Sequence, residues 1–307
     1  MNILIVGLGS IAAKHITALQ ALHLDVNLYA LRSSPEWKPY AGVKSIFALE
    51  EICEVLDFAI ISNPTSLHYE VIKSLSGLSV PLFVEKPLVD SVKGLEDLVS
   101  LVESKKIVSY VACNLRFHPC ITYLKKNIQD STVINEVNVY CGSYLPDWRP
   151  ATDYKQSYSA NRHMGGGVHL DLFHELDYLM WIFGLPSRSR CILSTKSSLR
   201  INAADYANYL LEYTSFNASV VLNYYRRTPK RQIEILFEDT TWIVDLIACE
   251  IRDGKGSIVY SDQNYTIIDT YKSQLNYFIR CLNDKKIPMN NIQESAEILK
   301  ICLINDN

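Results

Sequence analysis

The sequence shows no strong excess of charge of either sign: it holds 30 basic and 33 acidic residues, for a formal net charge of −3. Proteins that bind nucleic acid usually show a basic stripe, so this balance argues against a nucleic-acid partner. No apolar run approaches the roughly 20 residues of a membrane-spanning helix, so no membrane partner is expected. The opening MNILIVGLGS has no basic segment ahead of its apolar run, and we expect no signal peptide there.

Closely spaced cysteine pairs are also missing. The eight cysteines include no C-x-x-C pair, and no group of cysteine and histidine has zinc-finger spacing. Scattered cysteines of this kind are typical of reduced proteins of the cytoplasm. The sequence therefore predicts a cytoplasmic protein without a metal site.

The length and the apolar content predict two domains. The 307 residues, 48% of them apolar, exceed the usual size of one domain. The first part alternates short apolar runs with amphipathic segments, which indicates a parallel sheet covered by helices on both faces. Because crossovers in such a sheet are right-handed, we predict an α/β, doubly wound Rossmann domain over residues 1–116. Its strands are expected at 2–6, 26–31, 58–62, 81–84 and 108–112, and its helices at 11–22, 50–55, 67–75 and 92–104.

The rest of the chain has a different pattern. Longer β-type segments separated by turn residues predict a second α/β domain, with a large, mostly antiparallel open sheet, over residues 117–307. One helix is expected to interrupt the strands at 170–183 and to end at Gly184. The terminal helices can pack back on the first domain. The strands are expected at 133–144, 190–194, 205–213, 219–225, 232–237 and 241–246, and the other helices at 121–128, 272–282 and 295–303.

A glycine-rich turn, GLGSIA, follows the first predicted strand. In a G-x-G-x-x-A turn the first glycine, Gly7, permits the tight turn, and Gly9 lets the backbone approach a pyrophosphate. The small Ala12 lets the helix pack on the strand, and the helix N-terminus attracts the phosphates. In this context the turn predicts dinucleotide binding by Gly7, Gly9, Ser10, Ile11 and Ala12.

The second predicted strand ends without the acidic residue that would bind the ribose of NAD. Arg32 and Ser33 stand there instead, and they suit a ribose 2′-phosphate. The alternative interpretation is that Arg32 is a solvated loop residue. The predicted cofactor is therefore NADP or NAD.

Polar residues follow the third and fourth predicted strands, at the edge where doubly wound folds bind ligands. With the glycine turn, SNPTSLH at 62–68 and EKP at 85–87 resemble the Gfo/Idh/MocA family of nicotinamide-dependent oxidoreductases. The resemblance continues through NLRF at 114–117 and GGGVHLDLFHELD at 165–177. It implies that Lys86 lies beside nicotinamide and substrate, although a lysine at a strand end is more often solvated. It also implies cofactor contacts by Asn63, Pro64, Thr65, His68, Glu85, Lys86 and Asn114.

Asp171, His174 and Tyr178 have the spacing of one helical face. An imidazole suits a general base near neutral pH, and an acid one turn away would orient it or bind a substrate hydroxyl. The spacing alone also fits ordinary polar residues of a surface helix. The resemblance implies that Lys86, His174 and Asp171 are catalytic, and we expect an active site between the two domains.

An aromatic and charged loop follows the first long strand of the second domain. Aromatic rings beside Arg and Asp suit a sugar or polyol, and arginines suit a phosphate or carboxylate. The alternative is a connecting loop packed by its own aromatic residues. The predicted substrate-binding residues are Arg116, Tyr144, Trp148, Arg149, Tyr154 and Arg162, together with Asp171 and His174.

These observations predict an NAD(P)-dependent oxidoreductase that transfers a hydride between a nicotinamide cofactor and a secondary alcohol of a sugar, amino sugar or nucleotide sugar. Two alternatives remain open: an NAD-dependent glycosidase of the same family, and a non-catalytic regulator that senses a dinucleotide. The presence of both Lys86 and His174 counts against the regulator, because a sensor needs neither. We expect a homo-oligomer, a dimer or tetramer, that assembles through the C-terminal sheet.

Overall fold

The computed structural model describes residues 1–34, 36, 38–129 and 132–304. Contacts between residues divide the chain into two compact units. The first unit consists of Met1–Asn114 and Ile267–Glu297, and the second of Leu115–Thr266 and Ile298–Asn307. The domain boundary predicted after residue 116 stays a prediction. Within the described residues, no helix combines the length and the apolar character that crossing a membrane requires.

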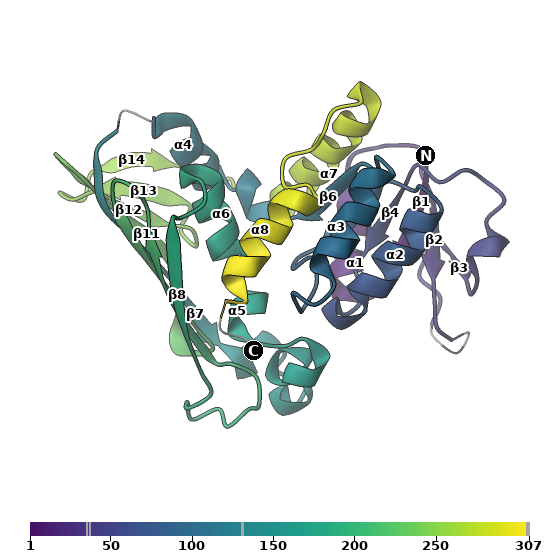
Figure 1. Ribbon diagram of the computed structural model, residues 1–307, viewed down its shortest axis with the longest axis horizontal. Coiled ribbons are helices and arrows are strands. Elements are labelled where there is room, and N and C mark those ends of the chain that lie inside the picture. The colour runs from purple at the N-terminus through teal and green to yellow at the C-terminus, as the bar shows by residue number, and fades with distance from the viewer. Residues whose placement is uncertain (35, 37, 130–131, 305–307) are drawn as a thin grey trace. The chain divides into compact units, whose positions relative to one another are not determined.

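The first unit is built on a six-stranded parallel sheet in the order β3-β2-β1-β4-β5-β6 (Figure 1). The chain starts in the middle of this sheet and winds outward to both edges, which confirms the predicted doubly wound Rossmann fold. Helices α2 and α3 pack against each other, and α1 packs against α7. The strands are β1 Asn2–Val6, β2 Asn27–Leu31, β3 Val43–Ile46, β4 Phe58–Ile61, β5 Leu82–Glu85 and β6 Ser109–Ala112, and the helices are α1 Ser10–Ala21, α2 His68–Gly77, α3 Leu95–Ser104 and α7 Ile267–Asp284.

The strands of this sheet are buried on both faces. Ile3, Leu4 and Ile5 are consecutive in β1, and none of them has exposed surface, which explains why the strand is continuously apolar rather than alternating. The ring of Phe278 on α7 packs edge-on against Phe58 on β4, with ring centroids 5.3 Å apart. A large apolar side chain buried in this way contributes about 1.5–3 kcal/mol, so α7 stabilises the Rossmann sheet.

Two details of the first unit differ from the sequence prediction. The helix predicted at 50–55 is wrong, because only a single 3₁₀ turn, Leu49–Glu51, forms there. The next residue, Ile52, already has an extended backbone. Strand β3 was not predicted, because it is a four-residue edge strand in which only Ile46 is fully buried.

The second unit contains an eight-stranded sheet in the order β14-β13-β12-β11-β7-β10-β9-β8. All neighbouring strands run antiparallel except β7 and β10, which are parallel, so the predicted large and mostly antiparallel sheet is confirmed. Helices α4 and α6 cover one face of this sheet (Figure 1). Strands β13 and β14 were not predicted. The strands are β7 Ile134–Tyr144, β8 Arg188–Ser194, β9 Tyr206–Glu212, β10 Asn217–Asn223, β11 Tyr225–Phe237, β12 Thr241–Asp245, β13 Glu250–Asp253 and β14 Ile258–Ser261, and the helices are α4 Pro119–Asn127, α5 Val168–Asp171 and α6 His174–Phe183. Helix α8, Ile292–Cys302, belongs to this unit from Ile298 onward and to the first unit before that.

The single helix predicted at 170–183 is wrong. The chain instead forms the short helix α5, which ends at Asp171, and a separate helix α6, which begins at His174. Asp171 therefore does not lie on the same continuous helix as His174 and Tyr178, which are both in α6. The end of α6 agrees with the prediction, because Gly184 follows it with a φ of +83°.

Candidate active site

The turn between β1 and α1 lies against the residues that follow β4. Gly7 has a φ of +88°, and a Cβ atom at this position would lie 2.4 Å from the backbone of Asn63. Only glycine fits such an approach. The hydroxyl of Ser62 donates a hydrogen bond of 2.8 Å to the carbonyl of Gly7. Gly7 is therefore required by the fold, since it lets two loops meet at the carboxyl edge of the sheet.

Gly9, in contrast, faces open space. No atom lies within 4 Å of the position that its Cβ would occupy, and α1 begins at the next residue, Ser10. The first N–H groups of a helix have no partners within the helix and attract anions. Ala12 is fully buried, so a larger residue would separate the helix from the sheet. These features fit a dinucleotide whose pyrophosphate lies against Gly9, beside the exposed Ser10 and the half-buried Ile11.

The side chain of Arg32 is half-buried at the end of β2. Its Nη1 donates a hydrogen bond of 2.9 Å to the carbonyl of Lys38 and lies 3.5 Å from the hydroxyl of Ser45. Ser33 is exposed beside it. This geometry places a positive charge at the carboxyl edge of the sheet, but it suits a phosphate contact and a loop residue equally, so both interpretations stay open.

His68 joins the loop after β4 to the loop after β5. Its Nε2 lies 3.0 Å from the carbonyl of Asn63, and its Nδ1 lies 3.2 and 3.1 Å from the carbonyls of Pro87 and Leu88. Burial lowers the pKa of His68, and these carbonyls oppose that shift. The structure thus gives His68 a role in holding two predicted cofactor loops together. Between these contacts, Pro64 is exposed and Thr65 is buried.

Lys86 directly follows β5 and is half-buried. Its backbone N–H donates a hydrogen bond of 3.2 Å to Oε2 of Glu85. The other oxygen, Oε1, lies 2.5 Å from Nε2 of His15, a fully buried residue of α1. The sequence prediction missed His15, although it occupies the buried stripe of α1 between Ala12 and Ile16, where a polar side chain needs a partner.

Asn114 follows β6 in the first unit and is buried. Its Nδ2 donates a hydrogen bond of 2.7 Å to the hydroxyl of Thr270, in the first turn of α7. This contact fixes the start of α7 to the carboxyl edge of the sheet. Its predicted cofactor contact stays a prediction.

Two tyrosines hold the carboxylate of Asp171 in the second unit. The hydroxyl of Tyr224 donates a hydrogen bond of 2.5 Å to Oδ2, and the hydroxyl of Tyr158 donates another to Oδ1. Burial raises the pKa of Tyr224 well above its ordinary value, so its hydroxyl keeps the proton that it donates. The half-buried His174 starts α6 three residues after Asp171. The arrangement keeps a carboxylate in a fixed position close in sequence to the predicted base.

Close packing of the backbone explains why glycines precede α5. A Cβ atom at Gly166 would lie 2.1 Å from the carbonyl oxygen of Tyr158, and Gly167 has a φ of +147°. The backbone N–H of Val168, the first residue of α5, donates to the carbonyl of Ala204 at 2.8 Å. These close approaches place α5 against the segment that carries Tyr158, which in turn binds Asp171.

Arg116 lies in the interior of the second unit, with no exposed surface. Its Nε and Nη2 donate hydrogen bonds of 2.9 and 2.7 Å to the two carboxylate oxygens of Asp177. A bidentate pair of this kind is strong and geometrically specific. It gives Arg116 a structural role that sequence analysis did not predict.

The predicted substrate loop brings three of its residues together. Trp148, Arg149 and Tyr154 line one small cavity of about 20 Å³, which is large enough for one water molecule. The ring of Trp148 packs edge-on against Tyr224 at 5.4 Å, so the loop also contacts a residue that binds Asp171.

The other predicted loop residues lie outside this cavity. The guanidinium of Arg227 lies 3.6 Å from the ring centroid of Tyr144. Arg162 is exposed, and its backbone N–H donates to the side-chain oxygen of Asn202 at 2.9 Å.

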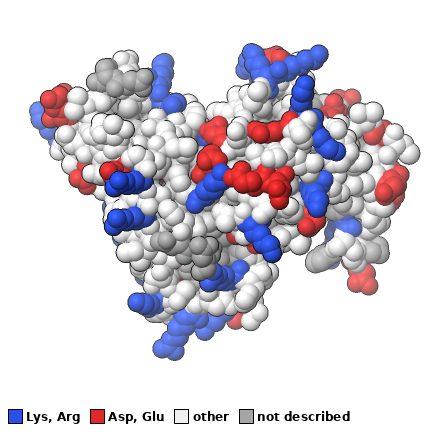
Figure 2. Space-filling model, in the orientation of Figure 1, with Lys and Arg blue, Asp and Glu red and all other residues white. Residues whose placement is uncertain are grey.

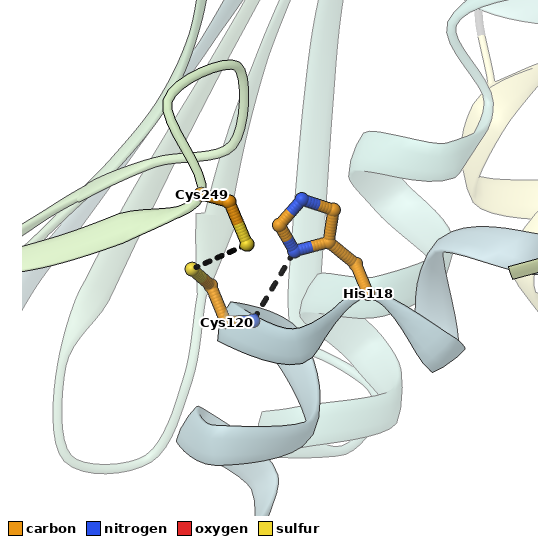
Figure 3. A group of neighbouring side chains, drawn as sticks. All are labelled: His118, Cys120 and Cys249. Atoms are coloured by element: carbon orange, nitrogen blue, oxygen red, sulfur yellow. Dashed lines mark hydrogen bonds between the residues drawn. The ribbon is translucent and has the colours of Figure 1, made fainter. Parts of the chain in front are cut away.

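A separate group of residues has the atoms needed to bind a metal ion. His118, Cys120 and Cys249 are buried, and their potential ligand atoms lie within 4.8 Å of one another (Figure 3). Burial lowers the pKa of His118 to about 4 and raises the pKa of both thiols. Sequence spacing missed this group because Cys249 is distant in the chain from the other two residues.

Basic and acidic residues are mixed on the face of the molecule that Figure 2 shows. Among the described residues, no basic stripe crosses that face. The mixture agrees with the small net charge of −3.

A glycine turn on a doubly wound parallel sheet, combined with a second domain built on an open and mostly antiparallel sheet, defines a two-domain NAD-binding oxidoreductase fold. Two family models match this chain. The model described as "Oxidoreductase family, NAD-binding Rossmann fold" matches residues 1–113, and the "GFO/IDH/MocA C-terminal domain" matches residues 125–244. The chain belongs to the Gfo/Idh/MocA family, which confirms the resemblance, and its first part is an NAD-binding Rossmann domain.

Curated relatives match parts of the chain. A putative oxidoreductase, YceM, from Salmonella typhimurium is 33% identical over 42% of this chain and 43% of its own length. Levoglucosan dehydrogenase from Pseudarthrobacter phenanthrenivorans is 27% identical over 44% and 35%. A scyllo-inositol 2-dehydrogenase (NADP(+)) from Bacillus subtilis is 24% identical over 59% and 50%. The chain thus spans half or less of the length of these relatives.

Solved structures match the fold over nearly the whole chain. Levoglucosan dehydrogenase in complex with NADH has a TM-score of 0.85 and 18% identity, over 100% of this chain and 95% of that one. The WlbA dehydrogenase from Bordetella pertussis, in complex with NADH and UDP-GlcNAcA, has a TM-score of 0.82 and 18% identity, over 98% and 93%. Similarity at this level of identity establishes the shared fold.

Proposed function

We propose that the protein transfers a hydride between NAD(P) and a secondary alcohol of a sugar, amino sugar or nucleotide sugar. The observation that supports this most is the presence of two groups suited to acid–base chemistry: Lys86 at the carboxyl edge of the Rossmann sheet, and His174 at the start of α6. A dinucleotide-binding fold without catalysis needs neither group. The names of the relatives, which include levoglucosan and inositol dehydrogenases, support a sugar or polyol substrate.

The proposed roles follow from the chemistry of each side chain. In the oxidation direction His174 accepts the proton of the substrate hydroxyl and later releases it to solvent. The Lys86 ammonium donates a hydrogen bond to the same oxygen and stabilises its developing negative charge. The side chain of Asp171, held in position by Tyr158 and Tyr224, orients His174 or a neighbouring hydroxyl. A bound nicotinamide supplies the hydride acceptor, so the alcohol carbon loses two electrons in all.

The residues that line the substrate follow in part from the loop after β7. Trp148, Arg149 and Tyr154 gather at one place, so we assign them to the sugar, with Tyr144 and Arg162 as further contacts. The cavity that Trp148, Arg149 and Tyr154 line is too small for a sugar. The sugar ring would therefore pack against these residues from outside the cavity. Arg116 is left out of this set, because its guanidinium is buried with Asp177.

The cofactor, assembly and location form the remaining part of the proposal. NADP is proposed to bind at least as well as NAD, since no acid ends β2 and Arg32 can contact a 2′-phosphate. The B. subtilis relative that is named for NADP(+) supports this choice. We further propose a homo-oligomer formed through the second sheet. A cytoplasmic location is proposed because all eight cysteines are free thiols.

The test is a panel of nucleotide sugars, free sugars and inositols, each offered with NAD⁺ and NADP⁺ while reduced nicotinamide is followed by absorbance. We expect steady reduction with at least one sugar. Hydrolysis of an aryl glycoside without net reduction of cofactor would indicate instead that the protein is a glycosidase. Tight cofactor binding without turnover of any compound would favour a regulator.

A further inference from the structure

The group His118, Cys120 and Cys249 has no part in the proposed function. His118 caps the N-terminus of α4 and Cys120 lies in the first turn of that helix, whereas Cys249 directly precedes β13 (Figure 3). All three residues belong to the second unit and are at most 3% exposed. The fold therefore brings together one imidazole and two thiols in a place that is shielded from solvent.

The spacing of the two sulfur atoms fits one metal ion. Sγ of Cys120 lies 3.9 Å from Sγ of Cys249. In a tetrahedral zinc site with Zn–S bonds of about 2.3 Å, two sulfur ligands lie about 3.8 Å apart. The sulfurs are also much further apart than the roughly 2.05 Å of a disulfide bond.

The ring of His118 is already oriented as in a metal site. Its Nε2 lies 3.0 Å from the carbonyl of Leu246 and must donate there, because a carbonyl only accepts. A metal-binding histidine usually donates its second N–H in this way, which leaves the other nitrogen as the ligand. That nitrogen, Nδ1, accepts a long hydrogen bond of 3.2 Å from the backbone N–H of Cys120. A metal ion would replace this bond and the weak hydrogen bond between the two sulfur atoms.

We propose that His118, Cys120 and Cys249 bind one Zn²⁺ ion, which fixes the turn before β13 to the start of α4. Two thiolates balance the two charges of Zn²⁺, whereas Cu⁺ would leave a buried negative charge, so zinc is favoured. On binding, two S–H bonds break, two Zn–S bonds form, and both protons pass to solvent. The three ligands leave the fourth tetrahedral position for a water molecule.

Charged residues of the second unit act on the group. Asp245 and Asp262 act electrostatically on Cys120, and Arg231 and Asp262 act on His118. The carboxylate of Asp245 accepts hydrogen bonds from the backbone N–H groups of Ile247 and Ala248, so it already stabilises the turn that precedes Cys249. Zinc would add a second connection at the same turn.

The experiment uses the full-length protein, purified under reducing conditions and freed of metal by a chelator. Co²⁺ is then titrated, because it occupies tetrahedral zinc sites and gives visible bands and a thiolate charge-transfer band. We expect saturation at one Co²⁺ per chain and loss of the bands when Zn²⁺ is added. Cys120→Ala and Cys249→Ala should each abolish the charge-transfer band. Cys191→Ala, which removes a buried thiol of β8 outside the group, should keep it.

Three results would overturn the proposal: no thiolate band in the wild-type protein, an equal band in Cys249→Ala, or a loss of two hydrogens in mass that marks a Cys120–Cys249 disulfide under reducing conditions. If the alanine variants do not fold, measurements on the wild-type protein test the zinc site instead. One tightly held zinc per chain and a higher thermal midpoint with added Zn²⁺ support the site, and the absence of both refutes it. None of these measurements depends on the catalytic activity, so failure here leaves the proposed oxidoreductase function untouched.

Discussion

The imidazole of His15 lies 2.5 Å from the carboxylate of Glu85, and both side chains are shielded from solvent. The two residues come from α1 and β5, which are far apart in the sequence. Since Glu85 also accepts a hydrogen bond from the backbone N–H of Lys86, this contact connects the helix of the glycine turn to the residue proposed for catalysis. The ring of His15 packs edge-on against Phe83 and Tyr271, which fixes its orientation.

Loss of the His15 contact is expected to destabilise the protein. His15→Leu leaves a buried carboxylate oxygen of Glu85 without this donor, and such a loss typically costs about 1–3 kcal/mol. His15→Gln keeps an N–H donor and should recover most of the free energy of unfolding. Denaturant unfolding of both variants provides the measurement. Equal unfolding midpoints for His15→Leu and the wild-type protein would show that the contact contributes nothing.

Cofactor binding should depend on Gly9. No atom lies within 4 Å of a Cβ at Gly9, so Gly9→Val is expected to fold, while its side chain would occupy the space of the pyrophosphate. We expect the dissociation constant for the reduced cofactor to rise at least about tenfold, or about 1.4 kcal/mol. Gly77→Val, at the exposed end of α2, is the matched control, because that position is equally open. Unchanged affinity in folded Gly9→Val would refute the assignment.

The choice between NADP and NAD should depend on Arg32. The wild-type protein is expected to bind NADPH at least as tightly as NADH, and Arg32→Ala should weaken NADPH more than NADH, because a charge-assisted contact to the 2′-phosphate is lost. Isothermal titration with both cofactors measures this. An NADH dissociation constant about tenfold tighter than that of NADPH in the wild-type protein would contradict the prediction.

Lys86 and His174 are predicted to act on the same substrate oxygen. Lys86→Ala and His174→Ala should each lower the single-turnover rate by about 10²–10⁴, which is typical of lost acid–base assistance. Cofactor affinity should stay within a few fold. Because both groups act on one oxygen, the double variant should lose less than the product of the two single losses. A near-wild-type rate in His174→Ala would remove it as the base.

The stability of the protein should fall in mildly acidic solution because of His68. Burial lowers its pKa in the folded state, so between that pKa and the ordinary value of about 6.5 the unfolded chain binds more protons. The stabilisation is complete above about pH 6.5 and is lost as the pH falls towards the lowered pKa. His68→Gln should flatten this part of the profile, as measured by urea unfolding from neutral to acidic pH. The same slope in variant and wild-type protein would exclude His68 as the source.

The sequence was sufficient for the parts of the structure that depend on local pattern. Buried parallel strands such as β1 are continuous apolar runs, and the glycine turn carries its own steric signature at Gly7. The short edge strand β3 lacks such a pattern and was missed. The break between α5 and α6 was missed because helical spacing continues through it.

Contacts between residues that are distant in the sequence could not be predicted from local patterns. The ion pair of Arg116 with Asp177 looks in the sequence like two independent polar residues. The tyrosines that hold Asp171 lie 13 positions before it and 53 positions after it. Only the structure shows that these side chains form hydrogen bonds with one another. Because the polar groups are buried, each of them needs such a partner.

The lone parallel pair in the second sheet affects how quickly this part of the protein can fold. Strand β10 pairs with β7 at about 80 positions' separation in the chain, so Glu136 faces Asn217 only after the whole intervening segment has been closed into a loop. Proteins rich in such non-local contacts reach the native state slowly, because the entropy of loop closure is lost before the contacts form. Tyr158 and Tyr224 lie on opposite sides of β8 and β9 in the sequence. The surroundings of Asp171 should therefore be completed late in folding, after the strands between them have found their neighbours.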